Sequence, residues 1–363
     1  MKSFVKITMA VLAVGMAATL AGCDGCMGCS TSANNNTLTN SNWYTGTSYK
    51  GIQRSFIVGE NSEYTKEVIE YGLNFEKGSN SSYSVDYKDG SLTTEFYATY
   101  YDWSTSHYPE DSKELVYYYK NEMTLSVQYK KGDNSSEWFA DSVVNESYFR
   151  AAGKELKPIY SKQVVKSTTP NNYQAGSVDG AYKKVEAVYE NFYNKTCTEV
   201  TSYKTEDGKT TEAVYGNLHK TEYTLFDNSS LYIAVRSMKL SDGLSQTISL
   251  FGAASGGVAN YNIAGNKDGI PEEQLNAISA ELQENKLFTP TEEKKTIPTV
   301  GVNINYAGGE LTGTTQKVWY AAIENYDNNT ARATMLKLEI PLSYNLGTLS
   351  FTLKDIKSNI WNK

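Results

Sequence analysis

The sequence predicts a mainly β protein: one large antiparallel meander sheet, for which a curved half-barrel is one possible form, with one or two helices packed on it. Two observations support this class. Apolar and polar side chains alternate with period two along several long stretches, as in strands that have one buried and one wet face. Tyrosine is abundant, with 29 residues against 16 Phe and Trp together, and it favours a pleated, half-exposed surface.

The clearest alternations cover residues 69–75, 123–129 and 336–342, and 349–353 follows the last of them. Short turn sequences fit hairpin connections between such strands. These turn sequences are Asp89-Gly90, Asp207-Gly208, Asp242-Gly243, Gly308-Gly309 and Asn345-Leu346-Gly347. The last of them predicts a hairpin over residues 334–355.

Two segments depart from the β pattern. Residues 271–287 are expected to form a helix, because Pro271 suits a first turn and an apolar face recurs at Leu275, Ile278 and Leu282. Residues 180–194 fit a helix and a strand almost equally well, and the pattern favours a helix slightly. A meander with one or two helices laid on the sheet is the simplest architecture for this order.

The N-terminus carries the most specific motif. Lys2 and Lys6 precede an apolar run of about 14 residues, which is too short to span a bilayer. Leu20-Ala21-Gly22-Cys23 follows, and the whole segment resembles the signal peptide of bacterial lipoproteins. The resemblance implies cleavage before Cys23 and attachment of diacylglycerol to its sulfur, with a palmitate-type acyl group on the new amine. It implies a lipid-anchored protein on the outer side of a bacterial membrane, in the periplasm or at the cell surface.

Three regions follow from this assignment. Residues 1–22 are the signal peptide, and residues 23–42 are a lipidated cysteine and a flexible tether rich in Ser, Thr and Asn. Residues 43–363 form the mainly β domain. A further boundary near 167–180 remains open, and so does one near 289–299.

Charge excludes one class of partner. The net charge of −7 becomes −9 once Lys2 and Lys6 are removed with the signal peptide. Nucleic acid binding needs clustered basic residues, so no nucleic acid partner is expected. Docking on anionic lipid is disfavoured for the same reason, so the lipid on Cys23 is expected to be the membrane contact.

The cysteines leave alternatives open. After lipidation of Cys23, Cys26, Cys29 and Cys197 remain, and any two of them could pair in an oxidising compartment. The spacing of the first three also recurs in half of an iron–sulfur or zinc site. A local disulfide or free thiols beside the membrane is the favoured interpretation, and no metal or cofactor is expected.

Catalytic residues are hard to find in this chain. The only histidines are His107 and His219, and neither lies beside a recognisable nucleophile. Paired carboxylates could hydrolyse a glycoside, with candidates such as Asp102, Glu110 and Asp111, but their separation is invisible in the sequence. No catalytic residue is therefore assigned, and the sequence favours a protein that is not an enzyme.

Two loops resemble known ligand loops only in part. Residues 264–275 contain Asn266, Asp268 and Gly269 at calcium-loop positions, yet Ala264 and Leu275 replace the anchoring carboxylates. A plain turn and helix start is expected there. The glycines of 252–257 lack the Lys-Ser/Thr ending of a phosphate loop, so an ordinary β connection is expected.

The densest aromatic loop spans residues 100–111 and provides the candidate ligand contacts. These are Tyr100, Tyr101, Trp103, His107 and Tyr108. Their flat rings could stack a sugar, although ordinary packing at a strand end is the plainer interpretation.

The favoured function is a non-catalytic binding protein for a small or apolar ligand. An apolar ligand would occupy a cavity lined by the inward rows, such as Leu336, Leu338, Ile340 and Phe351. The layout resembles that of carrier lipoproteins with a curved antiparallel half-barrel, a similarity of layout and not of motif. The alternatives are an envelope structural or protein-contact module and an extracellular carboxylate-dependent hydrolase. The ligand is a small molecule, a glycan or a protein.

Overall fold

The computed structural model describes residues 66–79, 84–152, 155–170, 182–218, 225–238, 240–252, 257–307, 315–322, 333–342 and 345–358. The signal peptide, Cys23, Cys26, Cys29, the tether, His219 and Gly308-Gly309 lie outside these ranges. Predictions made for them stay predictions.

The described residues form one sheet of sixteen strands, which confirms the mainly β class. The strands are β1 (Lys66–Lys77), β2 (Ser84–Asp102), β3 (Lys113–Lys131), β4 (Asn134–Ser135), β5 (Phe139–Ala152), β6 (Glu155–Pro170), β7 (Tyr182–Tyr193), β8 (Glu199–Glu206), β9 (Lys209–Gly216), β10 (Leu225–Asp227), β11 (Ser245–Gly252), β12 (Gly257–Asn266), β13 (Thr299–Tyr306), β14 (Gln316–Ala321), β15 (Met335–Leu342) and β16 (Gly347–Ser358). The described helices are α3 (Leu231–Arg236), α4 (Glu272–Glu284) and the short 3-10 turns η1 (Trp103–Thr105) and η4 (Asn228–Ser230).

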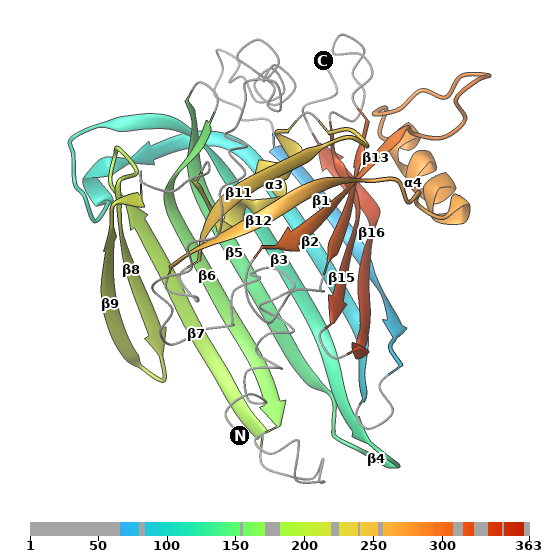
Figure 1. Cartoon of the computed structure of the whole chain (residues 1–363), viewed down its shortest axis with the longest axis horizontal. Coiled ribbons are helices and arrows are strands. Elements are labelled where there is room, and N and C mark those ends of the chain that lie inside the picture. Colours follow the sequence, from blue (N-terminus) through green and yellow to red (C-terminus); the bar gives the residue numbers. More distant parts are fainter. Residues whose placement is uncertain are drawn as a thin grey trace.

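The sheet is a meander that begins in its own middle. From β1 the strands follow in sequence order to the edge strand β9, then the chain crosses to the opposite edge at β10 and returns strand by strand to β16, which pairs with β1 (Figure 1). All pairs are antiparallel except β10 with β11, which run parallel. The sheet therefore curves strongly without closing into a barrel.

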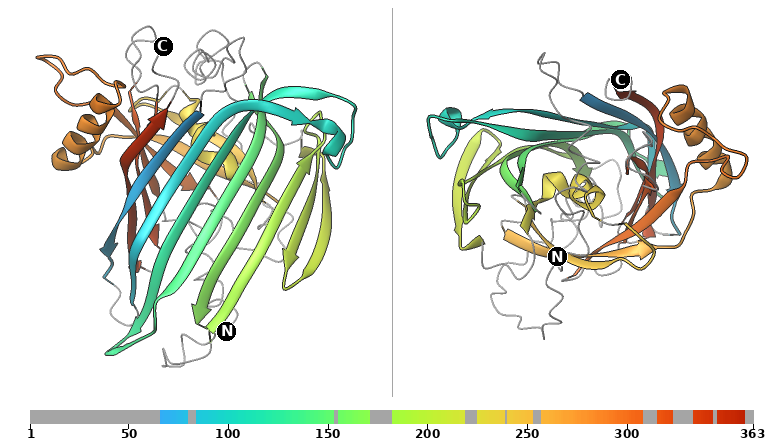
Figure 2. Two further views of the ribbon diagram at one scale, coloured as in Figure 1. Left: turned by 180° about the vertical axis from the view of Figure 1, so that it is seen from behind. Right: turned by 90° about the horizontal axis from the view of Figure 1, so that it is seen from above.

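A plug formed by η4 and α3 lies on the concave side of the sheet. Seen from above, α3 lies inside the ring of strands (Figure 2). Every residue of η4 and α3 is buried. The guanidinium of Arg236 makes two hydrogen bonds to the carboxylate of Glu67 on β1, at 2.6 and 3.1 Å, and both side chains are buried. The plug is thereby fixed to the strand at which the meander begins.

A polar belt on the inner face holds the other end of the plug. Asp227, immediately before η4, accepts hydrogen bonds from the hydroxyls of Ser161 and Tyr193, both at 2.6 Å, and from the Asn191 amide at 3.2 Å. A second chain of amides runs from Gln163 through Asn145 to Asn121, with 2.8 Å at each step. Buried polar groups need such partners, so this belt determines where the plug lies.

The two edges of the open sheet meet through side chains instead of backbone hydrogen bonds. Tyr193, Val200, Leu218 and Phe251 form a separate buried cluster that joins β7 and β8 to β11. The ring of Tyr215 on β9 lies 5.3 Å from that of Phe251, centroid to centroid. Apolar packing thus joins the two edges at this end of the ring of strands.

Several local predictions are confirmed. Strands β15 and β16 form the expected hairpin, with Asn345 and Gly347 at positive φ in the turn. Helix α4 buries Ile278 and Leu282, with Leu275 packed beside them. Among the described residues, no helix is both long and apolar enough to cross a bilayer.

Three local predictions are wrong. Asp242-Gly243 lies between α3 and β11 and is not a hairpin turn, since β11 pairs in parallel with β10. Residues 182–193 form strand β7, which pairs with β6 and β8, so the helix favoured for 180–194 is wrong. The sequence fits a helix and a strand almost equally well, and pairing with the neighbouring strands selects the strand. Asp89-Gly90 is a bulge inside β2 and not a hairpin turn. A side chain at Gly90 would collide with Leu73 and Leu125, which explains the glycine.

Candidate ligand-binding surface

Five aromatic side chains stand opposite one another on the outer face of the sheet, one on each of five neighbouring strands. The register pairs Tyr97 with Tyr118, Tyr118 with Tyr148, Tyr148 with Tyr160, and Tyr160 with Phe192. We call these five residues the aromatic row. Since neighbouring strands lie about 4.8 Å apart, the row spans about 19 Å across the strands.

Neighbouring rings of the aromatic row pack against one another. Their centroids are 4.9, 5.0, 6.1 and 4.9 Å apart along the row, and successive planes are tilted by 42° to 59°. Tyr118, the second of the five, is 8% exposed, whereas the other four are half-buried. Burial raises the pKa of Tyr97 to about 12, with Glu95 and neighbouring groups adding to the effect. Its hydroxyl therefore remains a neutral donor at any physiological pH.

A row of alternating charges runs beside the aromatic row on the same face. Register places Glu95, Lys120, Glu146, Lys162 and Glu190 opposite one another in that order. Tyr160 donates a 2.7 Å hydrogen bond to Glu190, which links the two rows. At the β1 end, Lys66 lies opposite Tyr97, with its ammonium 5.7 Å from the ring centroid and 2.5 Å from Glu95. With Lys66 included, the charge row holds three carboxylates and three ammonium groups, and Lys120 also forms a 2.9 Å ion pair with Glu122 on the same face.

The loop between β2 and β3, residues 103–112, packs along the other side of the aromatic row. Its first turn is capped by Asp102, whose carboxylate accepts hydrogen bonds from the Ser104 amide at 3.0 Å and hydroxyl at 2.6 Å. At its far end, the Tyr108 hydroxyl meets Glu199 at 3.0 Å and Thr201 at 2.9 Å on β8. The loop therefore extends over several strands and borders the row.

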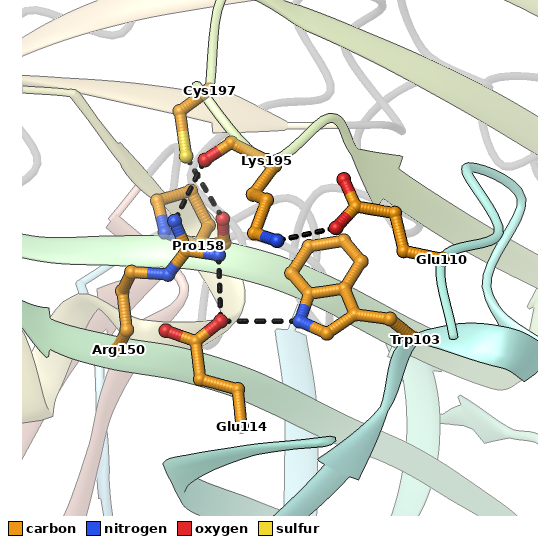
Figure 3. A network of polar contacts seen from close by, with 7 residues as sticks. All are labelled: Trp103, Glu110, Glu114, Arg150, Pro158, Lys195 and Cys197. Atoms are coloured by element: carbon orange, nitrogen blue, oxygen red, sulfur yellow. Dashed lines mark hydrogen bonds and ion pairs between the residues drawn. The ribbon is translucent and has the colours of Figure 1, made fainter. Parts of the chain in front are cut away.

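Trp103 anchors this loop through the contacts shown in Figure 3. Its indole N–H donates to Glu114 at 3.1 Å, and the same carboxylate oxygen accepts from Arg150 at 3.0 Å. The cations of Arg150 and Lys195 lie 5.5 and 6.0 Å from the ring. Lys195 also forms an ion pair with Glu110. These contacts fix the loop and leave Trp103 only 1% exposed.

The five predicted ligand contacts separate into three groups. Tyr101 and Trp103 are buried under the loop beside Tyr148, where they have a packing role. His107 is exposed and Tyr108 half-buried, and the His107 ring lies 6.0 Å from Phe192 at the end of the row. Tyr100 is 55% exposed and follows the opposite alternation of β2, so it lies away from the row.

The predicted apolar cavity finds no support at its proposed lining. Leu336, Leu338, Ile340 and Phe351 are each 0% exposed and belong to the main core cluster. These side chains are in close contact with their neighbours.

Two of the three candidate carboxylates, Asp102 and Glu110, make structural contacts, and the third, Asp111, is exposed. Asp102 caps η1, and its hydrogen bonds from Ser104 lower its pKa. Asp268, from the calcium-like loop, pairs with Lys317 at 2.7 Å and starts an ordinary turn before α4. Among the described residues, no group of three or more His, Cys, Asp or Glu could hold a metal ion.

Cys197 lies in the β7–β8 turn at φ 56°, and its thiol donates to the Pro158 carbonyl at 3.2 Å (Figure 3). Its pairing with Cys26 or Cys29, one of the alternatives that the sequence leaves open, falls outside the described residues.

Comparison with known proteins gives little. No protein-family model matches the chain, and no curated protein matches it. Among solved structures, a β-barrel-like protein of domain of unknown function DUF1849 from Brucella abortus is similar over 81% of this chain and 97% of its own, with 9% identity and a TM-score of 0.43.

Proposed function

We propose that this protein is a non-catalytic binding protein, anchored through lipid on Cys23 to the outer side of a bacterial membrane. Its ligand binds the outer face of the sheet along the aromatic row. The row itself is the observation that carries the proposal, because five aromatic side chains in cross-strand register are an unusual concentration of binding surface.

The burial of the described side chains on the concave side supports an external site. The plug and the apolar rows are buried there, so a ligand that bound against them would have to displace buried side chains. The outer face requires no such displacement. The tether of residues 23–42 would hold the folded domain near the membrane while leaving this face accessible.

The test is binding of the full chain, held in detergent, to two materials from the bacterium that makes it. The first is detergent-washed cell wall, measured by co-sedimentation, and the second is solubilised envelope protein on beads. We expect binding to at least one material, and we expect Tyr97→Ser/Tyr148→Ser to reduce it at least tenfold.

The matched control is Tyr100→Ser, which removes an exposed tyrosine of the same strand from the other face. This variant should bind like the wild type. If neither material binds, or if Tyr100→Ser reduces binding as much as the row variant does, the proposed function is wrong. Unchanged far-ultraviolet circular dichroism verifies that each variant is folded.

A further inference from the structure

We propose, on the basis of the function proposed above, that the ligand of the aromatic row is an extended chain of neutral sugar rings running across the strands. Three features of this face lead to the assignment: the repeat of the row, the charge balance beside it, and the polar character of both borders.

The repeat of the row fits a linear polymer of ring-shaped units. Each strand contributes one aromatic side chain, so ring positions recur about every 4.8 Å, close to the length of one pyranose in an extended chain. A single compact ligand would engage one or two rings and would make no use of a regular row.

Charge balance indicates a neutral polymer. Three carboxylates, Glu95, Glu146 and Glu190, alternate with Lys120 and Lys162, and Lys66 completes the balance at one end. A polyanion would meet these carboxylates and a protein that is negative overall. Neutral hydroxyls, by contrast, both donate and accept hydrogen bonds, so they can match alternating ammonium and carboxylate groups.

The two borders argue against a purely apolar partner. Charged residues border one side of the row, and the other side ends in the half-buried Tyr108 beside Glu199 and Thr201. An apolar helix or a lipid chain lying on the row would exclude water from these charged and polar groups, and desolvation of charged groups is costly even when they are paired. A sugar chain presents apolar C–H faces to rings and hydroxyls to both borders.

The experiment is isothermal titration of the full chain in detergent with cellohexaose, chitohexaose and mannohexaose, and with the corresponding disaccharides. At least one hexasaccharide should bind, and its disaccharide should bind at least tenfold more weakly, because fewer rings of the row are covered. Polygalacturonic acid, a polyanion, should bind at least tenfold more weakly than that hexasaccharide.

Two variants localise the site. Tyr97→Ser/Tyr148→Ser should weaken hexasaccharide binding at least tenfold, and Tyr100→Ser should leave it unchanged. If the double variant does not fold, Glu146→Gln in the half-buried charge row provides the test, with a loss of at least threefold expected.

The results distinguish this inference from the function on which it rests. Row-dependent binding to envelope protein, with no binding of the three hexasaccharides, would overturn the glycan assignment and leave an external binding protein. Equal binding of the polyanion would overturn the neutral class. Failure in both experiments would overturn the binding function and its ligand together.

Discussion

Asp141 is a buried carboxyl on the inner face of β5, where burial raises its pKa from an ordinary value of 3.8 to about 7. It accepts a 2.9 Å hydrogen bond from the Thr168 amide, which opposes this shift only in part. Because its pKa is higher in the folded state, the protonated carboxyl favours folding. This contribution is lost as the pH rises from about 4 through about 7.

Asp141→Asn should remove this pH dependence. Relative to the variant, the wild type is expected to lose up to about 4 kcal/mol of unfolding free energy between pH 4 and pH 8, at 1.36 kcal/mol per pKa unit. Urea unfolding at both pH values measures the difference. Asp133→Asn, in an exposed turn, is the control and should follow the wild type. Parallel pH profiles for wild type and Asp141→Asn would show that the carboxyl titrates normally.

At the scale of single residues, the sequence indicated which side chains alternate but not which are buried polar. Met123 and Leu125 are buried as expected, and Tyr117, Tyr118 and Tyr119 alternate faces. Asp141 and Glu67 occupy inward positions that the apolar pattern does not reveal. In the sequence, a buried polar residue inside a strand looks the same as an exposed polar residue at the end of a strand.

Helix α3, which is buried on the concave side of the sheet, was not predicted. Its six residues are too few for a helical period to be recognised. Helix α4, with thirteen residues preceded by Pro271, was predicted correctly. Strand β7 was misassigned because its aromatic spacing fits both periods until a neighbouring strand is known.

The Glu67–Arg236 pair should determine how firmly the plug is held. Arg236→Met leaves a buried carboxylate without its partner, and we expect a loss of about 3–5 kcal/mol in unfolding free energy. Glu67→Gln/Arg236→Met removes both charges and should lose less. Urea unfolding of the two variants at pH 7 provides the comparison. A double variant no more stable than Arg236→Met would show that the pair contributes through packing and not through charge.

At the scale of the whole molecule, the site arises from strand register. The five aromatic residues of the row, Tyr97, Tyr118, Tyr148, Tyr160 and Phe192, are separated by unequal lengths of chain, so no period in the sequence connects them. Loop lengths and bulges, such as that between Tyr148 and Phe149, align them. The sequence did indicate the neighbouring loop at 100–111, since its aromatic density is local. The mainly β class, by contrast, could be predicted from the alternation and the tyrosine content, because neither depends on how the strands are aligned with one another.

Hydroxyl-radical footprinting of the full chain, with and without the envelope material that binds it, tests the central claim most directly. We expect oxidation of Tyr97, Tyr148 and Tyr160 to fall several-fold on binding, while Tyr100 and Trp138, both exposed, stay unchanged. Protection confined to Tyr100, Trp138 or residues of the plug, with the aromatic row oxidised as before, would contradict an external site on the row.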